Sequence, residues 1–168
     1  MEEVLKINKY LSEEELYKSL LTQIGSLINP GEPVISNLAN VTAVLKEAFN
    51  KISWVGFYLL KGYKLYLGPF QGKVACTVIG VGKGVCGNSA ASKQTIIVED
   101  VEKYPGHIAC DAGSRSEIVI PLLKDNNIYG VLDLDSYRPS AFNLLDKEYL
   151  EKLCISLTQN LSFEKFVL

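Results

Sequence analysis

The hydrophobic pattern of this chain changes its period near residue 52, and that change limits the folds the chain can adopt. Before residue 52, apolar residues recur at every third or fourth position, which is typical of amphipathic helices. After it they alternate with polar or small residues, which is typical of strands whose two faces differ. A long stretch of helical spacing returns only after Asn143. We therefore expect an α+β fold in which helices from the two ends of the chain pack on a mostly antiparallel sheet.

Capping residues predict where the first and last helices begin. Ser12 begins the first helix with Glu15 as its capping-box partner, and Asn143 begins the last helix with Asp146 at its third position. Further helices are predicted at 34–48 and 84–92, and strands at 52–60, 64–67, 74–79, 95–98, 117–123 and 128–134. We expect one domain, residues 1–168, with a sheet of about six strands whose one covered face packs on the terminal helices.

Charge and composition exclude several classes of protein. The chain carries 17 basic and 19 acidic side chains with no block of one sign. We therefore expect no nucleic-acid partner. The sequence has no apolar stretch near the roughly 18 residues that a membrane span needs, and its start lacks the basic and apolar regions of a secretory signal. We expect no membrane partner and a location in the reducing cytoplasm.

Four cysteines, Cys76, Cys86, Cys110 and Cys154, stand out in such a chain. Structural disulfides are rare in the cytosol, where thiols outside the core tend to be metal ligands, nucleophiles or redox partners. The first three are separated by intervals of 10 and 24 residues, which do not match the paired spacing of zinc sites, so we expect no metal. Cys154 falls on the apolar stripe of the last helix and is predicted to be a core residue.

Cys110 lies in a segment rich in turn-forming and polar residues, 104–116, that leads directly into Glu117. Loops of this kind often carry functional residues. Arg115, His107 or a group of backbone amides could each favour the thiolate form of Cys110. For His107 itself, the pattern favours a place at the loop surface.

Residue parity separates the predicted strands into two unlike faces. The apolar face comprises Val55, Phe57, Leu59, Ile118, Ile120, Leu122, Ile128, Leu132 and Leu134. The opposite face comprises Trp54, Gly56, Tyr58, Glu117, Val119, Pro121, Val131, Asp133 and Asp135. The first face is a plain core, whereas the second brings two aromatic residues and three carboxylates together.

Carboxylates on central strands are costly to bury unless they are paired or hydrogen-bonded. Asp133 and Asp135 therefore either face water, pair with Arg115 or Arg138, or join Glu117 in binding a ligand's ammonium group or supplying a proton. The aromatic pair has two readings as well. Trp54 and Tyr58 either complete the core or line a ligand site. In the second case Gly56, which lies between them and has no side chain, would leave an open floor on which a ligand could lie.

Six segments, residues 54–58, 67–72, 82–87, 107–111, 114–121 and 130–136, together resemble those of free methionine-(R)-sulfoxide reductases, a family of GAF-domain enzymes. A generic GAF domain would share the fold but not three cysteines at these intervals. The resemblance covers nearly the whole chain. It implies a GAF-like fold and the reduction of free L-methionine (R)-sulfoxide to methionine, with thioredoxin or another dithiol as the external reductant and no cofactor. It also implies a homodimer.

The resemblance assigns a role to each site residue. Cys110 would attack the sulfoxide sulfur, Cys76 would then form a disulfide with it, and Cys86 would be an accessory or alternative thiol. The methyl end of the substrate would lie against Trp54 and Tyr58. Its ammonium group would bind Glu117, Asp133 and Asp135, and Asp133 would also assist protonation of the sulfoxide oxygen.

Two other classes of protein compete with this hypothesis. One is a non-catalytic GAF-type module that senses a small molecule or the redox state through its thiols. We expect no output domain attached to a chain of 168 residues, which favours the enzyme. The other is a structural protein, which would leave the carboxylate-bearing face without a reason.

Overall fold

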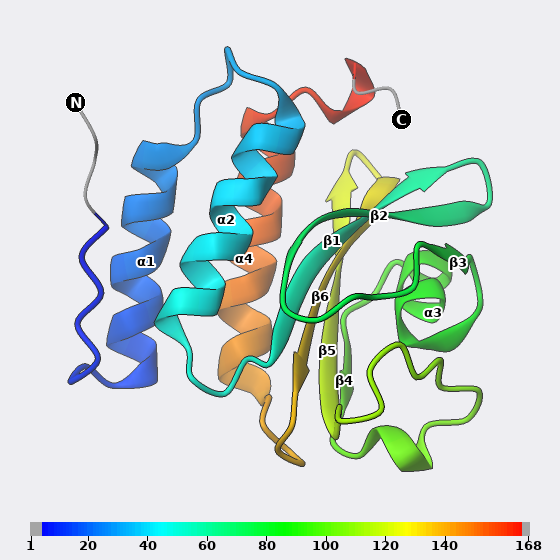
Figure 1. Cartoon of the computed structure of the whole chain (residues 1–168). Helices are drawn as coiled ribbons and strands as arrows, with labels where there is room; N and C mark the ends of the chain where they lie inside the picture. The colour runs from blue at the N-terminus through cyan, green and yellow to red at the C-terminus, as the bar shows by residue number, and fades with distance from the viewer. Residues whose placement is uncertain (1–4, 166–168) are drawn as a thin grey trace.

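A six-stranded antiparallel sheet with helices on both faces forms the centre of the computed structural model, which describes residues 5–165 (Figure 1). The elements are α1 (Glu13–Leu27), α2 (Val34–Ala48), β1 (Trp54–Lys61), β2 (Lys64–Gln71), β3 (Val78–Gly80), α3 (Gly84–Ser92), β4 (Ile96–Val98), β5 (Ser116–Lys124), β6 (Asn127–Ser136) and α4 (Leu144–Asn160). The sheet order is β3-β2-β1-β6-β5-β4. These features confirm the predicted α+β fold. Residues 1–4, which belong to the segment predicted to lack a secretory signal, lie outside the described residues.

Both predicted capping boxes are present, at Ser12 and Asn143. The second one also joins distant parts of the chain. One oxygen of Asp146 accepts from the Asn143 backbone, and the other accepts from the Tyr17 hydroxyl and the Lys51 ammonium, each at 2.7 Å. The beginning of α4 is therefore tied to α1 and to the segment that precedes β1.

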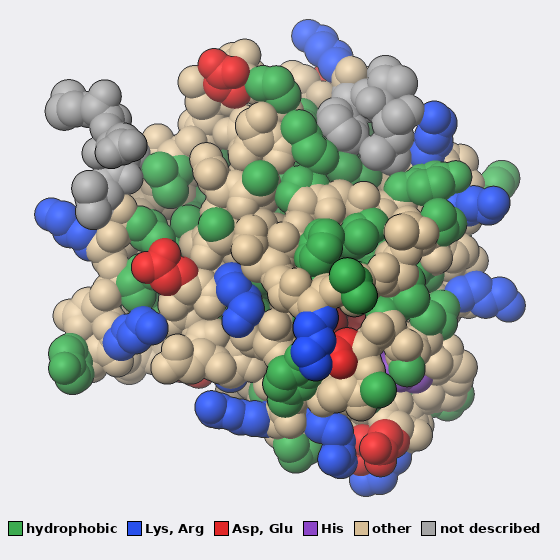
Figure 2. Space-filling view, viewed as in Figure 1, with side chains coloured by type: hydrophobic (Ala, Val, Ile, Leu, Met, Phe, Trp, Pro, Cys, Tyr) green, Lys and Arg blue, Asp and Glu red, His purple; other side chains and the backbone are tan. Residues whose placement is uncertain are grey.

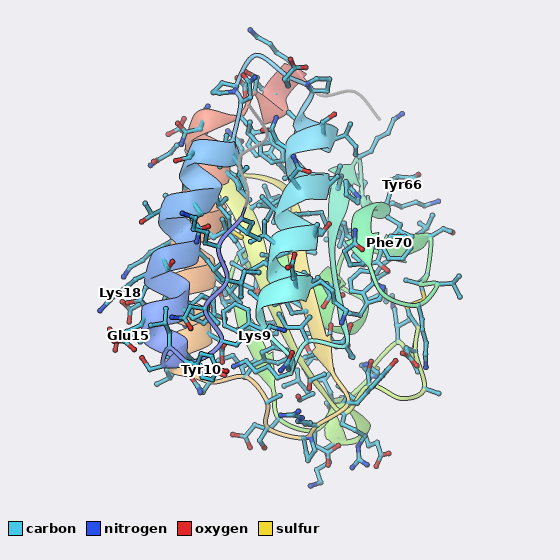
Figure 3. The ribbon with its side chains drawn as sticks, turned by 60° about the vertical axis from the view of Figure 1, so that its left-hand side comes forward. Lys9, Tyr10, Glu15, Lys18, Tyr66 and Phe70 are labelled. Atoms are coloured by element: carbon cyan, nitrogen blue, oxygen red, sulfur yellow. A yellow bond between two sulfur atoms is a disulfide. The ribbon has the colours of Figure 1, made fainter. Side chains whose placement is uncertain are left out.

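Helices α1, α2 and α4 cover one face of the sheet, as predicted, and Figure 3 shows Glu15 and Lys18 of α1 pointing away from it. The buried side chains on this face include Val55, Phe57 and Leu59 of β1. None of the helices in the described range is long and apolar enough to cross a membrane. Figure 2 shows Lys and Arg side chains scattered over the face in view, with fewer Asp and Glu side chains among them.

The prediction of one covered face is wrong, because α3 and two loops cover the second face and form a smaller core there with side chains of the sheet. This covering depends on a close backbone approach. A Cβ at Gly87 of α3 would lie 2.2 Å from the Gly80 carbonyl oxygen of β3, so only glycine lets the helix and the strand meet there. Helix α3 is short and has few apolar residues, so its periodic signal is weak. The sequence therefore did not predict that α3 packs on the second face of the sheet.

Two strand predictions also need correction. The strand predicted at 74–79 is reduced to Val78–Gly80, and the preceding residues form a loop in which Val74 is 86% exposed. By contrast, β2 continues to Gln71 and pairs with β1 as far as Val55. A register shift on β2 accommodates Pro69, since a bulge is one of the places where a sheet tolerates proline.

The parity argument fails at a second irregularity, at the start of β6. Leu122 pairs with Gly130 but Leu123 pairs with Ile128, so Tyr129 is an extra residue on β6. Consequently Ile128 packs in the smaller core on the second face, and not on the helix-covered face as predicted. A bulge reverses the facing of every residue on its far side, and nothing in the apolar pattern marks it.

Candidate active site

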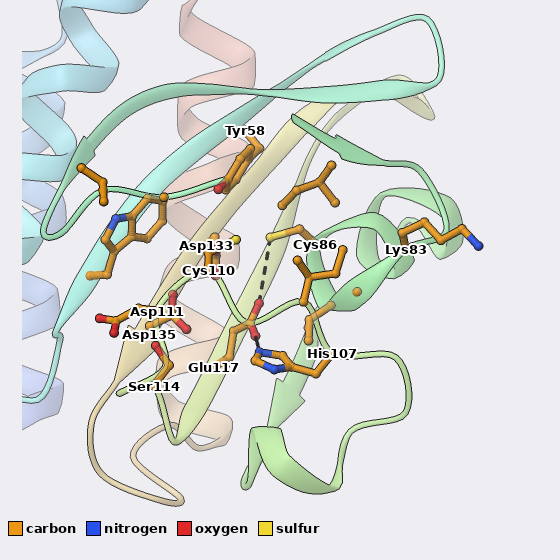
Figure 4. Close-up of a pocket in the computed structure, with 17 residues that line it drawn as sticks. Tyr58, Lys83, Cys86, His107, Cys110, Asp111, Ser114, Glu117, Asp133 and Asp135 are labelled. Carbon is orange, nitrogen blue, oxygen red and sulfur yellow. Dashed lines mark hydrogen bonds and ion pairs between the residues drawn. The ribbon is translucent and has the colours of Figure 1, made fainter. Parts of the chain in front are cut away.

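A pocket opens on the second face of the sheet, between strands β1, β5 and β6, the beginning of α3 and the two loops that carry Cys76 and Cys110 (Figure 4). It encloses about 500 Å³ of empty space, its open mouth included. Its lining includes Trp54, Tyr58, Val74, Lys83, Cys86, His107, Ile108, Cys110, Asp111, Ser114, Glu117, Asp133 and Asp135. The pocket brings together every predicted site residue except Cys76.

Sheet register places the three carboxylates side by side. Glu117 of β5 lies directly opposite Asp135 of β6, and Asp133 stands two residues away on the same face. Glu117 and Asp133 are only 5% and 6% exposed. Of the ion pairs in residues 5–165, none joins Arg115 or Arg138 to this cluster, so the predicted arginine pairing is absent. Asp133 Oδ1 is buried without any hydrogen-bond partner.

Burial is the main reason that the pKa values of all three carboxyl groups lie well above their ordinary range. Their mutual repulsion adds to it: Asp135 raises the pKa of Glu117, Glu117 that of Asp133, and Asp133 that of Asp135. The cluster therefore holds its protons to a higher pH than exposed carboxyl groups do. It can accept a cation in their place, or deliver a proton to a bound molecule.

Cys86 of α3 is buried against this cluster, and its sulfur lies 4.0 Å from Glu117 Oε1. Burial, and then the charges of Asp133 and Glu117, raise the pKa of the Cys86 thiol well above its ordinary value. The thiol is therefore a hydrogen-bond donor and a poor nucleophile. Ligand atoms of Cys86, Glu117 and Asp133 lie within 4.8 Å of one another, so among residues 5–165 this group could hold a metal ion.

Cys76 and Cys110 form a disulfide with a Cα–Cα distance of 5.4 Å. The bond links two loops, residues 72–77 and 104–115, across the second face of the sheet. Cys110 lines the pocket, whereas Cys76 does not. Cys154 is a free thiol in the helix-covered core, which confirms its predicted place.

The aromatic pair holds one of these loops as well as lining the pocket. Trp54 donates its indole N–H to the carbonyl of Lys73 at 3.0 Å, and Tyr58 donates its hydroxyl to the carbonyl of Cys76 at 2.9 Å. The predicted open floor at Gly56 is wrong, because a Cβ there would lie 2.4 Å from the Trp54 ring. That ring fills the space and stacks on Phe70, a residue that the sequence did not single out.

His107 lies in the pocket and not at the loop surface as predicted. Its side chain is 15% exposed, and Nε2 is 3.5 Å from Glu117 Oε2. Burial lowers the pKa of the imidazole, which favours its neutral form. Sequence reasoning also missed Ser114, whose hydrogen bond lowers the otherwise raised pKa of Asp135. The available signal for Ser114 was its place three residues before Glu117.

Comparisons with known proteins agree with this geometry. The GAF domain family model matches residues 14–161. A free methionine-R-sulfoxide reductase of Escherichia coli is 43% identical over 159 residues, covering 93% of this chain and 96% of that protein, and one of Saccharomyces cerevisiae is 42% identical over 162 residues, covering 92% and 90%. The solved structure of a free methionine-R-sulfoxide reductase of Neisseria meningitidis with its substrate superposes with a TM-score of 0.88 at 44% identity, covering 96% and 95% of the two chains.

Proposed function

This chain belongs to the GAF domain family and, within it, to the free methionine-R-sulfoxide reductases, and on that premise we propose which of its residues carry out the reaction. The chain is an oxidoreductase that converts free methionine (R)-sulfoxide to methionine. The pocket supplies what this chemistry needs: a thiol, a proton donor, and a group of carboxylates that can receive the ammonium of a free amino acid.

Cys110 is the nucleophile of the proposed mechanism, and Cys76 is the resolving thiol. The observation that carries this assignment is that Cys110 lines the pocket while its disulfide partner Cys76 does not. The alternative nucleophile, Cys86, faces two carboxyl groups that disfavour its thiolate. We therefore assign Cys86 the accessory role of donating a hydrogen bond to Glu117.

The reaction proceeds in two steps. The thiolate of Cys110 attacks the sulfoxide sulfur, the oxygen is protonated and transferred to the enzyme sulfur, and methionine leaves a sulfenic acid on Cys110. The thiol of Cys76 then attacks that sulfur, and water leaves as the disulfide forms. Asp133 suits the role of proton donor in the first step, because burial and the neighbouring Glu117 raise the pKa of its carboxyl and so favour the protonated form.

Substrate recognition rests on charge at one end of the pocket and on aromatic surface at the other. Glu117, Asp133 and Asp135 receive the ammonium group, which provides the positive charge that no arginine supplies. The polar atoms of Trp54 and Tyr58 are engaged with the adjacent loop, so the parts of their rings that line the pocket can contact the methyl end.

The catalytic cycle closes when an external dithiol, such as that of thioredoxin, reduces the disulfide. No resident cofactor is needed, since two thiols supply both electrons. Recycling of this kind fits a reducing compartment, so we retain the cytoplasm as the proposed location. A homodimer also remains a prediction, and the molar mass of the protein in solution tests it.

Turnover of the two substrate epimers tests the function directly. The protein should form methionine from free methionine (R)-sulfoxide with dithiothreitol or thioredoxin, and little from the S epimer, because attack at sulfur requires one orientation of the oxygen. Chromatography of methionine for each epimer is the measurement. Formation of no methionine from the R epimer would overturn the enzyme hypothesis and favour the non-catalytic sensor.

Replacement of Asp135 by asparagine should raise KM for the sulfoxide by roughly 10- to 100-fold, because one ionised partner of the ammonium is lost. In the wild type, KM should fall as pH rises through the raised pKa of the carboxyl cluster, since ionised carboxylates bind the cation better. This dependence should be weaker in Asp135→Asn. Asp125→Asn, in the exposed turn before β6, is the matched control. An unchanged KM in Asp135→Asn would contradict the ammonium role.

A further inference from the structure

The two loops that carry the cysteines meet at a second place besides the disulfide. Asp111 directly follows Cys110, Lys73 lies three residues before Cys76, and Tyr137 directly follows the last residue of β6. The Tyr137 hydroxyl donates to Asp111 Oδ2 at 2.8 Å, and the Lys73 ammonium lies 3.7 Å from Asp111 Oδ1. The same ammonium lies 5.1 Å from the centre of the Tyr137 ring. We call Lys73, Asp111 and Tyr137 the clasp.

Local structure builds the clasp around the charge of Asp111. The Gly113 N–H donates to Asp111 Oδ1 at 2.9 Å. This hydrogen bond and the one from Tyr137 lower the pKa of Asp111, which favours the charged carboxylate. A Cβ at Gly113 would lie 2.9 Å from the Tyr137 ring, so glycine at this position lets the ring close over the loop. Figure 4 shows Asp111 beside Cys110.

Other contacts anchor both loops to the rigid sheet. The Arg115 N–H donates to the Ser136 carbonyl at 2.8 Å, which fixes the end of the loop that carries Cys110. The bonds from Trp54 and Tyr58 fix the loop that carries Cys76. Only the clasp and the disulfide join the two loops to each other, among the contacts described here between residues 72–77 and 104–115. When the disulfide is reduced, the clasp alone remains.

We propose that Lys73, Asp111 and Tyr137 are positioning residues that keep Cys76 within reach of Cys110 in the reduced enzyme, and so speed the attack of the Cys76 thiol on the Cys110 sulfenic acid. This inference rests on the proposed function. The step forms the S–S bond and releases the sulfenic oxygen as water. Its rate depends on the effective concentration of one sulfur at the other, which falls when the loops move independently. The attack on the substrate sulfoxide does not involve Cys76, so the clasp acts on the second step alone.

A single-turnover experiment separates the two steps. Prereduced protein, freed of dithiothreitol, receives one equivalent of methionine (R)-sulfoxide, and alkylation stops the reaction at set times. Tyr137→Phe should form methionine at the wild-type rate but form the disulfide roughly two- to fivefold more slowly, because the hydrogen bond that it loses to Asp111 is exposed to solvent. A 1,3-diketone probe should trap more sulfenic acid in this variant. Lys73→Met should slow disulfide formation by a comparable factor, because Lys73 makes the clasp contacts of the loop that carries Cys76, with Asp111 and with the Tyr137 ring.

Tyr63→Phe is the matched control, because Tyr63 lies in the turn between β1 and β2 and is 88% exposed. It should leave both steps at wild-type rates. Equal rates of disulfide formation in Tyr137→Phe and the wild type would overturn the clasp, and so would a matching loss in the methionine step, which indicates general damage. Absence of methionine in every sample would instead overturn the proposed function.

A measurement without substrate keeps the clasp testable in that case. At equilibrium in a buffer of reduced and oxidised glutathione, Tyr137→Phe should contain less Cys76–Cys110 disulfide than the wild type, by roughly the same two- to fivefold factor in effective concentration. Thiol alkylation followed by mass spectrometry gives the oxidised fraction. An identical fraction in the two proteins would show that the clasp does not hold the thiols together.

Discussion

Replacement of Cys110 by serine should reduce methionine formation by roughly 10³-fold or more, because the hydroxyl of serine is a far weaker nucleophile toward sulfur than a thiolate. Replacement of Cys76 should have a different result. Cys76→Ser retains the attacking thiol, so it should form one equivalent of methionine and then stop with a sulfenic acid on Cys110. Single-turnover chromatography of methionine and mass spectrometry of the protein distinguish the two variants.

Cys154→Ala is the control for removal of a thiol outside the pocket. Cys154 is buried in the helix-covered core, so the variant should lose some stability but form methionine at the wild-type rate under conditions where it is folded. If Cys110→Ser and Cys76→Ser gave equal single-turnover yields, the assignment of attacking and resolving thiols would be wrong. A burst retained in Cys110→Ser and lost in Cys86→Ser would identify Cys86 as the nucleophile.

The regular elements of this fold could be predicted because each rests on a local signal. Ser12 and Asn143 begin their helices with side chains that accept hydrogen bonds from backbone amides, as their sequence contexts indicate. The carboxylate cluster was predictable for the same reason. Glu117 and Asp135 belong to strands that alternate regularly, so parity alone placed them on one face, and the hairpin then set them opposite each other.

The rest of the site depends on contacts for which the sequence carries no period. Cys76 and Cys110 are 34 residues apart and lie in loops, so only the folded chain brings them together. His107 lies inside the pocket because its loop returns over the sheet to Glu117, a path that turn-forming residues allow but do not specify. The prediction for Ile128 was wrong because β6 contains an extra residue, Tyr129, which reverses the facing of the residues that precede it on the same strand.

Acetylation of the substrate nitrogen should lower kcat/KM by roughly 10³-fold or more, because a site built around a charged hydrogen-bond donor rejects an analogue that lacks it. N-acetylmethionine (R)-sulfoxide carries no ammonium, so Glu117, Asp133 and Asp135 would be left buried against an uncharged amide. A methionine sulfoxide residue within a protein presents the same amide. The measurement is kcat/KM for the free and the acetylated sulfoxide under identical reducing conditions.

Charge must be separated from size in this comparison. N-methylmethionine (R)-sulfoxide adds a carbon but retains the positive charge, so it should lose much less activity than the acetylated compound. The enzyme variant provides the second arm. Because Asp135→Asn already lacks one ionised partner, it should discriminate less between the free and the acetylated substrate than the wild type does. Equal losses for the methyl and acetyl compounds would mean that steric exclusion, and not unpaired buried carboxylates, confines this enzyme to the free amino acid.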